Sequence, residues 1–537
     1  MNKFLILLSA ILLSAAVSAQ EKITADSLAA SKKRTGQPKE TGFKPLHENT
    51  SDSLLTYHQA VNSTSFLHSG ATLLRGSNIS KYGIASLSYQ QAAGHFRVAQ
   101  EAEKTSSAAF STEGVSTLEK FKLYGYFSFK RSWDDSLAFN QKGIKDANQP
   151  AYFIAGKAGD YERQTYTGGG IISYALKDHK LFLATGVDYL YNTTAGSVDP
   201  RALITNYKLI FSPELSYQTG EHIIGAGVSL GYGSEKIGIA YKNKDFDGSL
   251  LYPSRVSYLN YGYGFITVSK NNFSRNNTYS GFNLQYAGKL ADWKINSKFS
   301  YLVMQENSEI DRTNTLKAEK FESYQLQTYQ VDLLAEKRAS SHTQQLNFHL
   351  LKERGDDKLT VLAARNYFYN HDEAYLSYSY LNRNRKGRNT EWAAGINYQN
   401  TYSKDAAASH QLKYNYISPE LSHTQYWKGT GKDLISAELG VMARLPLTTA
   451  VNVPETQETL FTRGVVYPDF YYWSAKAGQL QFKFNYITDH LIKKFRTGLS
   501  LKTSYLKPLD TIRQTYTSTF IPAKGYAEFY IALNLYL

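Results

Sequence analysis

Basic side chains recur at alternating positions along this chain, opposite stripes of apolar residues. Amines and guanidinium groups that share one surface attract and bind anions. Acids on the same faces are fewer, which predicts a surface biased toward anionic or polyhydroxylated solutes. The alternative is that the charges pair across strands and fill an interior. The candidate basic residues are Lys120, Lys122, Lys130, Lys208, Lys294, Lys298, Lys413, Lys483, Arg496 and Lys502, and the acids are Asp188, Glu214, Asp332, Glu438 and Glu528.

Side chains that alternate with a period of two belong to β-strands. Residues 293–303 show the pattern, with Trp293, Ile295 and Phe299 on one face and Lys294 and Lys298 on the other. Similar stretches recur from residue 81 to the end of the chain. They predict an all-β fold, a transmembrane antiparallel up-and-down β-barrel of about 20 strands, within a range of roughly 18 to 22. The apolar stripe then faces lipid, and the basic face lines the interior.

The predicted connections alternate between short and long. Short connections in such barrels are periplasmic, and long ones are extracellular. The alternation fails twice, around residues 236–275 and again around 370–403, where we expect a miscounted or bent strand. The short connections include residues 177–180, 218–220 and 489–490, and the long ones include 132–160, 305–321 and 446–478.

The composition agrees with a barrel and excludes other classes. Aromatic residues are abundant, with 43 Tyr and 27 Phe, yet the mean hydropathy is −0.42. A polar lumen with aromatic belts at the membrane interfaces explains both values. The absence of cysteine excludes a disulfide framework and a cysteine metal site. The net charge of +14 is diffuse, so we predict no nucleic-acid partner.

The first 19 residues read as a secretory signal peptide, with Lys3 in a short basic region, an apolar core and a Val17-Ser18-Ala19 cleavage site. Residues 20–80 are more polar and form a second segment, either periplasmic or a plug in the lumen. Residues 81–537 form the predicted barrel. Export of a cysteine-free chain favours the outer membrane of a Gram-negative bacterium.

The C-terminal eleven residues form one amphipathic strand. A tilted strand needs about nine to eleven residues to cross a bilayer. We expect this strand to close the barrel and to be read by the barrel-insertion machinery. Its apolar face holds Phe529, Ile531, Leu533, Leu535 and Leu537.

A short motif occurs twice, as residues 211–217 and 417–423, each containing Ser-Pro-Glu-Leu. Proline removes a ladder donor, so Pro213 and Pro419 are expected at β-bulges. The repeated motif either marks equivalent periplasmic ends of two strands or is a coincidence.

Catalytic chemistry has little support in the sequence. No Gly-x-Ser-x-Gly turn occurs, and no phosphate-binding glycine loop is present. Asp134 and Asp135 with a distant histidine could imitate the acid–histidine pair of an outer-membrane protease, but adjacent acids in a loop are more often solvated. We therefore predict no catalytic, cofactor-binding or metal-binding residues.

The signal-peptide junction, the aromatic strands without a TonB-type plug sequence and the terminal residues 531–537 resemble an uncharacterised family of outer-membrane β-barrels from Bacteroidota. The resemblance implies fold and location and carries no assigned activity. The leading expectation is a porin-like channel for small hydrophilic or anionic solutes. The alternatives are a closed structural barrel that acts through other envelope proteins, and a surface hydrolase. The other expected partners are outer-membrane lipids and lipopolysaccharide.

Overall fold

The computed structural model describes residues 68–77, 79–145, 148–176, 180–249, 251–269, 271–310, 319–383, 388–428, 433–492 and 495–537. All of them belong to one compact unit, Pro45–Leu537. The predicted signal peptide and residues 20–67 lie outside the described residues.

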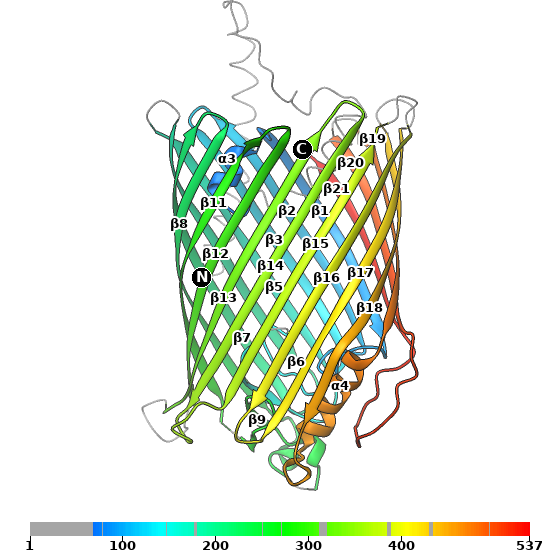
Figure 1. The fold of residues 1–537 in the computed structure, drawn as a ribbon. Helices are drawn as coiled ribbons and strands as arrows, with labels where there is room; N and C mark the ends of the chain where they lie inside the picture. The colour runs from blue at the N-terminus through cyan, green and yellow to red at the C-terminus, as the bar shows by residue number, and fades with distance from the viewer. Residues whose placement is uncertain are drawn as a thin grey trace, which may run out of the picture. The chain divides into compact units, whose positions relative to one another are not determined.

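Eighteen long strands pair in sequence order into one antiparallel sheet that closes on itself (Figure 1). The closing pair joins the first strand to the last, from Ile84 opposite Tyr536 to Gly94 opposite Tyr526. The predicted antiparallel barrel is confirmed, with a strand number at the lower end of the expected range. The strands are β1 Lys81–Gly94, β2 Lys104–Leu118, β3 Phe121–Leu137, β5 Gly159–Ala175, β6 Leu181–Gly196, β7 Arg201–Thr219, β8 His222–Ala240, β11 Phe273–Leu290, β12 Trp293–Ile310, β13 Glu319–Arg338, β14 His342–Leu359, β15 Tyr367–Asn382, β16 Arg388–Asp405, β17 His410–Lys428, β18 Leu434–Asn452, β19 Ala477–Ile492, β20 Phe495–Pro508 and β21 Tyr526–Tyr536.

The outer wall of the barrel is apolar and exposed. Leu230, Leu439 and Leu533 are each more than half exposed, although water would penalise such a continuous apolar surface. A closed barrel satisfies its backbone hydrogen bonds internally, which a lipid environment demands. The apolar wall therefore faces the hydrocarbon core of a membrane. Among the described residues, no helix is long and apolar enough to cross a membrane.

The two ends of the barrel differ. Short turns join the strands at one end, here called the short-turn end, and longer connections lie at the other, here called the loop end. The predicted long connection 132–160 is shorter than expected, because β3 continues to Leu137 and β5 begins at Gly159. The irregularity near residues 236–275 is a connection with its own small strands, whereas β15 and β16 pair without a break from Tyr367 to Asn382.

The prediction of bulges at the two prolines is wrong. Two residues on each strand lie between the pair Phe211–Leu230 and the pair Glu214–Gly227, so the register of β7 with β8 does not shift at Pro213. The register of β17 with β18 is likewise unchanged around Pro419 and shifts instead at Asn415 and Tyr416. Each proline interrupts the ladder without inserting a residue.

Smaller elements occupy the loop end. Three short strands, β4 Ala151–Ile154, β9 Tyr258–Tyr261 and β10 Ile266–Val268, form a separate antiparallel sheet in the order β10-β9-β4. The connection between β18 and β19 carries a π-helix, η5 Thr462–Val466, and the helix α4 Tyr467–Ser474. Single-turn 3₁₀ helices are η2 Lys244–Phe246, η3 Pro253–Arg255 and η4 Glu455–Gln457.

Candidate functional site in the barrel lumen

The segment His68–Ser77, here called the plug, lies inside the barrel at the short-turn end. Its centre is the six-residue helix α3 Ala71–Gly76 (Figure 1). A helix this short is not stable alone, so packing must hold it. Leu73 and Leu74 are completely buried, and α3 packs against strands β3, β5 to β8, β11 and β12.

Polar groups of the barrel wall hold the first turn of α3. The Ala71 backbone N–H donates to Glu214 Oε2 at 2.8 Å, and Gln285 Nε2 donates to the same oxygen at 2.9 Å. The hydroxyls of Thr72 and Ser216 lie 2.7 Å apart. A carboxylate that accepts from the N-terminus of a helix makes a charge-assisted hydrogen bond. Glu214 therefore holds the N-terminus of α3 against the barrel wall.

Basic side chains fix both ends of the plug. Lys298 Nζ donates to the Ser69 carbonyl at 2.5 Å, and Lys122 Nζ donates to the Ser77 carbonyl at 2.6 Å. From the plug itself, Arg75 Nε donates to Ser173 Oγ at 2.9 Å. Two of the lysines predicted for the lumen thus bind neutral carbonyls of the plug.

Gly225 on β8 makes room for the plug. A Cβ at this position would lie 1.8 Å from Thr72 Oγ1 and 2.7 Å from Ser216 Oγ. No carbon atom can approach an oxygen so closely, because their van der Waals contact distance is above 3 Å. Any larger residue at this position must displace the hydroxyls or the helix.

His68 marks the inner end of the plug. Its ring stacks on Tyr124 at 4.3 Å between centroids, and its Nδ1 lies 3.1 Å from the Tyr82 hydroxyl. Burial, followed by the charge of Lys122, lowers the pKa of His68 to about 4. The imidazole is therefore neutral at neutral pH, which allows it to lie close to a lysine.

A second inserted structure closes over the loop end. We call it the cap: β4, β9, β10 and the described residues of connections 138–158 and 241–272. β4 and the central residues of β9 are buried, whereas Val268 at the end of β10 is exposed. Phe153 and Leu259 pack with Ile204 and Phe273 of the barrel wall, while Tyr152, Ile154 and Tyr258 pack with Phe461 and Val465. The cap therefore extends across the mouth from the β7–β11 wall to the π-helix η5.

Two barrel residues anchor the β9–β10 turn of the cap. Asp405 Oδ2 accepts the backbone N–H groups of Tyr263 and Phe265, each at 2.9 Å. His410 contacts the Tyr263 carbonyl through Nδ1 at 3.1 Å and the Thr462 hydroxyl through Nε2 at 3.0 Å. The turn passes so close that a Cβ at Gly264 would lie 1.6 Å from His410 Nδ1, and its φ is +133°.

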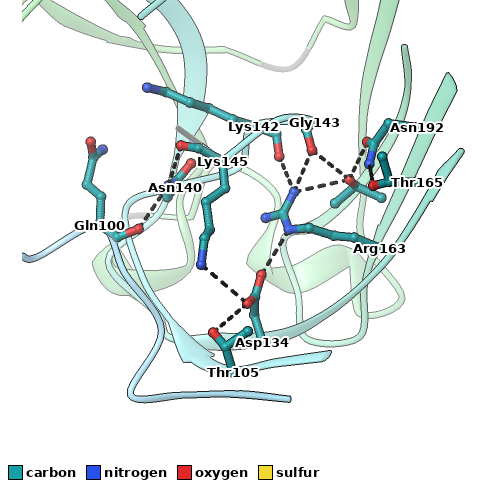
Figure 2. Close-up of polar contacts among 11 residues, drawn as sticks. Gln100, Thr105, Asp134, Asn140, Lys142, Gly143, Lys145, Arg163, Thr165 and Asn192 are labelled. Atoms are coloured by element: carbon teal, nitrogen blue, oxygen red, sulfur yellow. Dashed lines mark hydrogen bonds and ion pairs between the residues drawn. The ribbon is translucent and has the colours of Figure 1, made fainter. Parts of the chain in front are cut away.

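A buried ion pair anchors the other side of the cap (Figure 2). Arg163 Nε lies 2.9 Å from Asp134 Oδ2, and Arg163 Nη1 donates to the carbonyls of Lys142 and Gly143 at 2.6 and 2.8 Å. Asp134 is only 2 % exposed, so its interpretation as a solvated loop acid is wrong. Arginine holds two carbonyls and a carboxylate at once because its guanidinium is a planar fork of donors.

Two adjoining cavities lie in the lumen, and Tyr124 and Tyr126 line both. The first has a volume of about 480 Å³ between β1–β3 and β19–β21. The second has a volume of about 380 Å³ and is bordered by His68 and Ser69 of the plug. Together we call them the chamber. Volumes in this range suit small-molecule ligands.

The chamber wall carries hydroxyls, amides, three lysines and three acids. Lys483, Lys502 and Glu113 line the first cavity, and Lys298, Asp188 and Glu214 line the second. Lys483 and Lys502 are directly opposite each other on β19 and β20, an arrangement of like charges that destabilises a sheet. Glu438 Oε1 neutralises Lys483 at 2.8 Å, whereas Lys502 is exposed to the chamber. Ser, Asn and Tyr side chains, including Asn485, line the same cavity. This wall can bind an anion and donate hydrogen bonds to hydroxyl groups.

The remaining predicted basic residues fall into three groups. Lys130, Lys208, Lys294 and Arg496 have the strand parity of the inner face. Lys120 lies in the turn between β2 and β3 and not on the wall. The prediction for Lys413 is wrong: it is exposed and alternates with Leu412 and Tyr416, which are buried on the inner side of β17.

The C-terminal strand β21 has its apolar residues on the outer face, as expected. Phe529, Leu533 and Leu537 are 43 %, 54 % and 61 % exposed, while Asn534 on the opposite face accepts a hydrogen bond from Ser86 on β1. The role of this strand as an insertion signal stays a prediction.

Metal-binding chemistry is sparse in the described part of the chain. Asp433, Asp489 and His490 each place one ligand atom within 4.8 Å of the others near the β19–β20 turn. His490 is exposed and lies 3.7 and 3.8 Å from the two carboxylates. A surface ion-pair group explains this geometry.

Sequence reasoning missed the residues that hold the plug and the cap. Glu214 was placed on the inner face without a role, although its Ser-Pro-Glu-Leu motif recurs at Glu420, which also faces inward and accepts from the Tyr375 hydroxyl. The sequence around Asp405 and His410 does not indicate that they hold the cap, because their partners are backbone groups of a distant connection.

Comparisons with known proteins give a family model and weak structural likenesses. No curated protein matches the chain. Solved structures with similar barrels include the ferric citrate transporter FecA (TM-score 0.38, 9 % identity, 85 % of this chain and 78 % of that chain). Two others are the copper transporter OprC (0.39, 8 %, 85 % and 80 %) and the outer-membrane transporter YddB from Escherichia coli (0.36, 8 %, 86 % and 81 %). Likenesses this weak carry no argument about activity.

The family assignment rests on a family model that matches residues 71–537, from α3 to the last residue. The closed barrel and its apolar wall give the location, because barrels of this kind span the outer membrane of Gram-negative bacteria. The chain is a multi-pass outer-membrane β-barrel and belongs to the Family of unknown function (DUF6850).

Proposed function

We propose that this protein is a gated outer-membrane transport barrel for small hydrophilic, anionic solutes. The observation that supports this most is the polar chamber, in which Lys483 and Lys502 face hydroxyl and amide groups. Glu438 pairs with Lys483, whereas no salt bridge to Lys502 is found among the described residues. A purely structural barrel has no need of such an exposed lysine in its lumen. An anionic solute would supply the missing counter-charge.

The plug and the cap argue for gating over a permanently open pore. The cap packs across the loop end, and the plug occupies part of the short-turn end. A solute that crosses must pass the cap and leave past the plug. Apolar packing and hydrogen bonds to wall residues such as Asp405 and Glu214 hold both structures. The hydrogen bonds can break and re-form without unfolding the barrel.

The test is ion conductance in planar lipid bilayers with variants that release each gate. Gly264→Ala should displace the β9–β10 turn from His410, and Gly225→Ala should unseat α3. We expect low conductance from the wild type and the largest conductance when both changes are combined. Gly156→Ala is the matched control in the cap, because a Cβ there meets only ordinary contacts of 3.5 Å or more.

Selectivity tests the chamber itself. In the double variant we expect anion preference, and adding Lys502→Glu should move the reversal potential toward cation preference. The chain contains no cysteine, so a Thr72→Cys, Ser216→Cys pair can lock the plug by oxidation, since their hydroxyls are 2.7 Å apart. Conductance that is absent from every variant, reduced or oxidised, would refute transport.

A closed structural barrel is the second candidate, and the cap favours it because its apolar core is complete on both faces. This function predicts no conductance and a stable envelope protein partner that co-purifies through the loop end. A surface hydrolase is the third. Its acid candidate, Asp134, is bound to Arg163, and an activity screen against lipid and peptide substrates tests it.

A further inference from the structure

Four buried carboxyl groups cluster under the cap at the loop end of β8, β11, β12, β13 and β14. Glu235, Glu306, Glu322 and Asp357 are each at most 2 % exposed. The cluster has one buried cation, Arg275, whose Nε lies 2.7 Å from Glu235 Oε2 and whose Nη1 lies 3.2 Å from Glu306 Oε1. Arg275 thus serves the first two acids.

In the described part of the chain, neither of the other two carboxyl groups forms a salt bridge with a cation, although the charge of Arg275 acts on Glu322. Glu322 and Asp357 are diagonal neighbours on β13 and β14, because Glu322 is opposite Leu359 and Asp357 is opposite Tyr324. Their carboxyl groups lie within hydrogen-bonding range of one another. Among the described residues, no donor reaches Glu322 Oε1, Glu322 Oε2 or Asp357 Oδ2. Buried polar atoms are almost always satisfied, and two carboxylates this close cannot both ionise in a dry site without a proton or a cation between them.

We infer that Glu322 and Asp357 form a binding site for a hard divalent cation of the Ca²⁺ class. A shared proton would satisfy one oxygen of each group and leave a second Glu322 oxygen bare, whereas a cation contacts all three. A proton also leaves the four acids and Arg275 with two uncompensated negative charges, and a divalent ion leaves one. The donors are all oxygen atoms, which suit calcium and not zinc or copper.

The site connects directly to the cap. Asp357 Oδ1 accepts the backbone N–H groups of Asn366 and Tyr367 at 2.8 and 2.7 Å. The Asn366 side chain then donates to the carbonyl of Tyr261, on β9, at 3.1 Å. A cation at Asp357 therefore stiffens the chain of contacts that holds the small sheet in the mouth. This inference does not depend on the proposed transport.

The experiment measures the melting temperature of the full-length protein in detergent after treatment with EDTA. Adding CaCl₂, compared with NaCl of equal ionic strength, should raise Tm by about 3–6 °C when calcium is well above its Kd. Glu322→Gln keeps the shape of the side chain and should abolish the rise. Asp356→Asn is the control, because Asp356 is adjacent in sequence, has a side chain 42 % exposed and pairs with Arg365.

A second measurement needs no variant. Tb³⁺ replaces Ca²⁺ at oxygen sites and is sensitised by tyrosine, and the buried Tyr324 is directly opposite Asp357 in the β13–β14 register. We expect terbium luminescence that calcium displaces. A wild-type protein with no Tm shift and no luminescence, or a Glu322→Gln variant that responds as the wild type does, would overturn the cation site in favour of a shared proton.

Discussion

Replacing Gly225 by alanine should release the plug. The new Cβ would lie 1.8 Å from Thr72 Oγ1 and 3.1 Å from Thr72 Cβ. Rotation of the threonine relieves the first contact but not the second, so α3 must shift and the Thr72–Ser216 hydrogen bond must break. A broken buried hydrogen bond costs about 1–3 kcal/mol, and overpacking costs a similar amount.

Together these costs destabilise the bound state of the plug by about 3 kcal/mol. Because about 1.4 kcal/mol corresponds to a factor of ten, the population of the unbound plug should rise roughly 100-fold. The assay uses Ala71→Cys as a reporter, since Ala71 is 1 % exposed and the chain has no other cysteine. When opening is fast relative to labelling, the maleimide reaction rate follows the open population.

Gly186→Ala in the same reporter background is the control. Gly186 also faces the lumen, but a Cβ there meets Ser212 at an ordinary 3.5 Å. We expect its labelling rate to match that of the reporter alone. Equal rates for the Gly225 and Gly186 variants would refute the view that α3 rests against Gly225.

Three further predictions concern the loop end and the barrel wall. Asp469 on α4 is partly buried and accepts the Ala99 N–H at 2.8 Å, and desolvation raises its pKa to about 7. The folded state therefore retains a proton that the unfolded state releases above about pH 4. The free energy of unfolding should fall by up to about 4 kcal/mol between pH 4 and 7. Asp469→Asn should flatten this dependence in pH-resolved melts, and an unchanged slope would contradict the assignment. Arg163→Met leaves Asp134 without its main buried partner at a cost of about 3–5 kcal/mol, so proteolysis of connection 138–158 should accelerate, and resistance equal to that of the wild type would argue against the anchor. Leu533→Arg puts a charge on the lipid face of β21 and should destabilise refolding into lipid vesicles by about 2–4 kcal/mol, whereas an unaffected unfolding curve would place Leu533 outside the hydrocarbon core.

The barrel could be predicted because the side-chain alternation within each strand shows which residues face inward and which face outward. Alternation along residues 293–303 places Lys298 inside and Phe299 outside without knowledge of any partner. The terminal strand is equally local, and its exposed Leu533 lies where the pattern puts it. Because lipid lies outside the barrel and the lumen is polar, the same alternation of apolar and polar residues applies to most strands of the wall.

That pattern fails near the loop end of β17. There Leu412 and Tyr416 are buried on the inner side, where Tyr416 stacks on Trp473 of α4, and Lys413 faces outward. The apolar side of β17 is thus reversed there, which is why the prediction for Lys413 was wrong. The plug and the cap could not be predicted for a related reason. Their stability comes from contacts such as Ala71 with Glu214, across a separation of 143 residues, and no local pattern encodes such pairs.

The pairing of β4 with β9 has a consequence for biogenesis. Ala151 and Tyr261 come from different connections and meet only inside the mouth, and their sheet is covered by Phe461, which lies a further 200 residues along the chain. Contacts so distant in sequence form late, after loop closure has brought their strands together. The face of the cap that carries Tyr152 and Ile154 therefore stays accessible until the connection after β18 is in place. A chain stalled before that point would expose this face, so the burial of Ile154 against Phe461 accompanies the completion of the barrel.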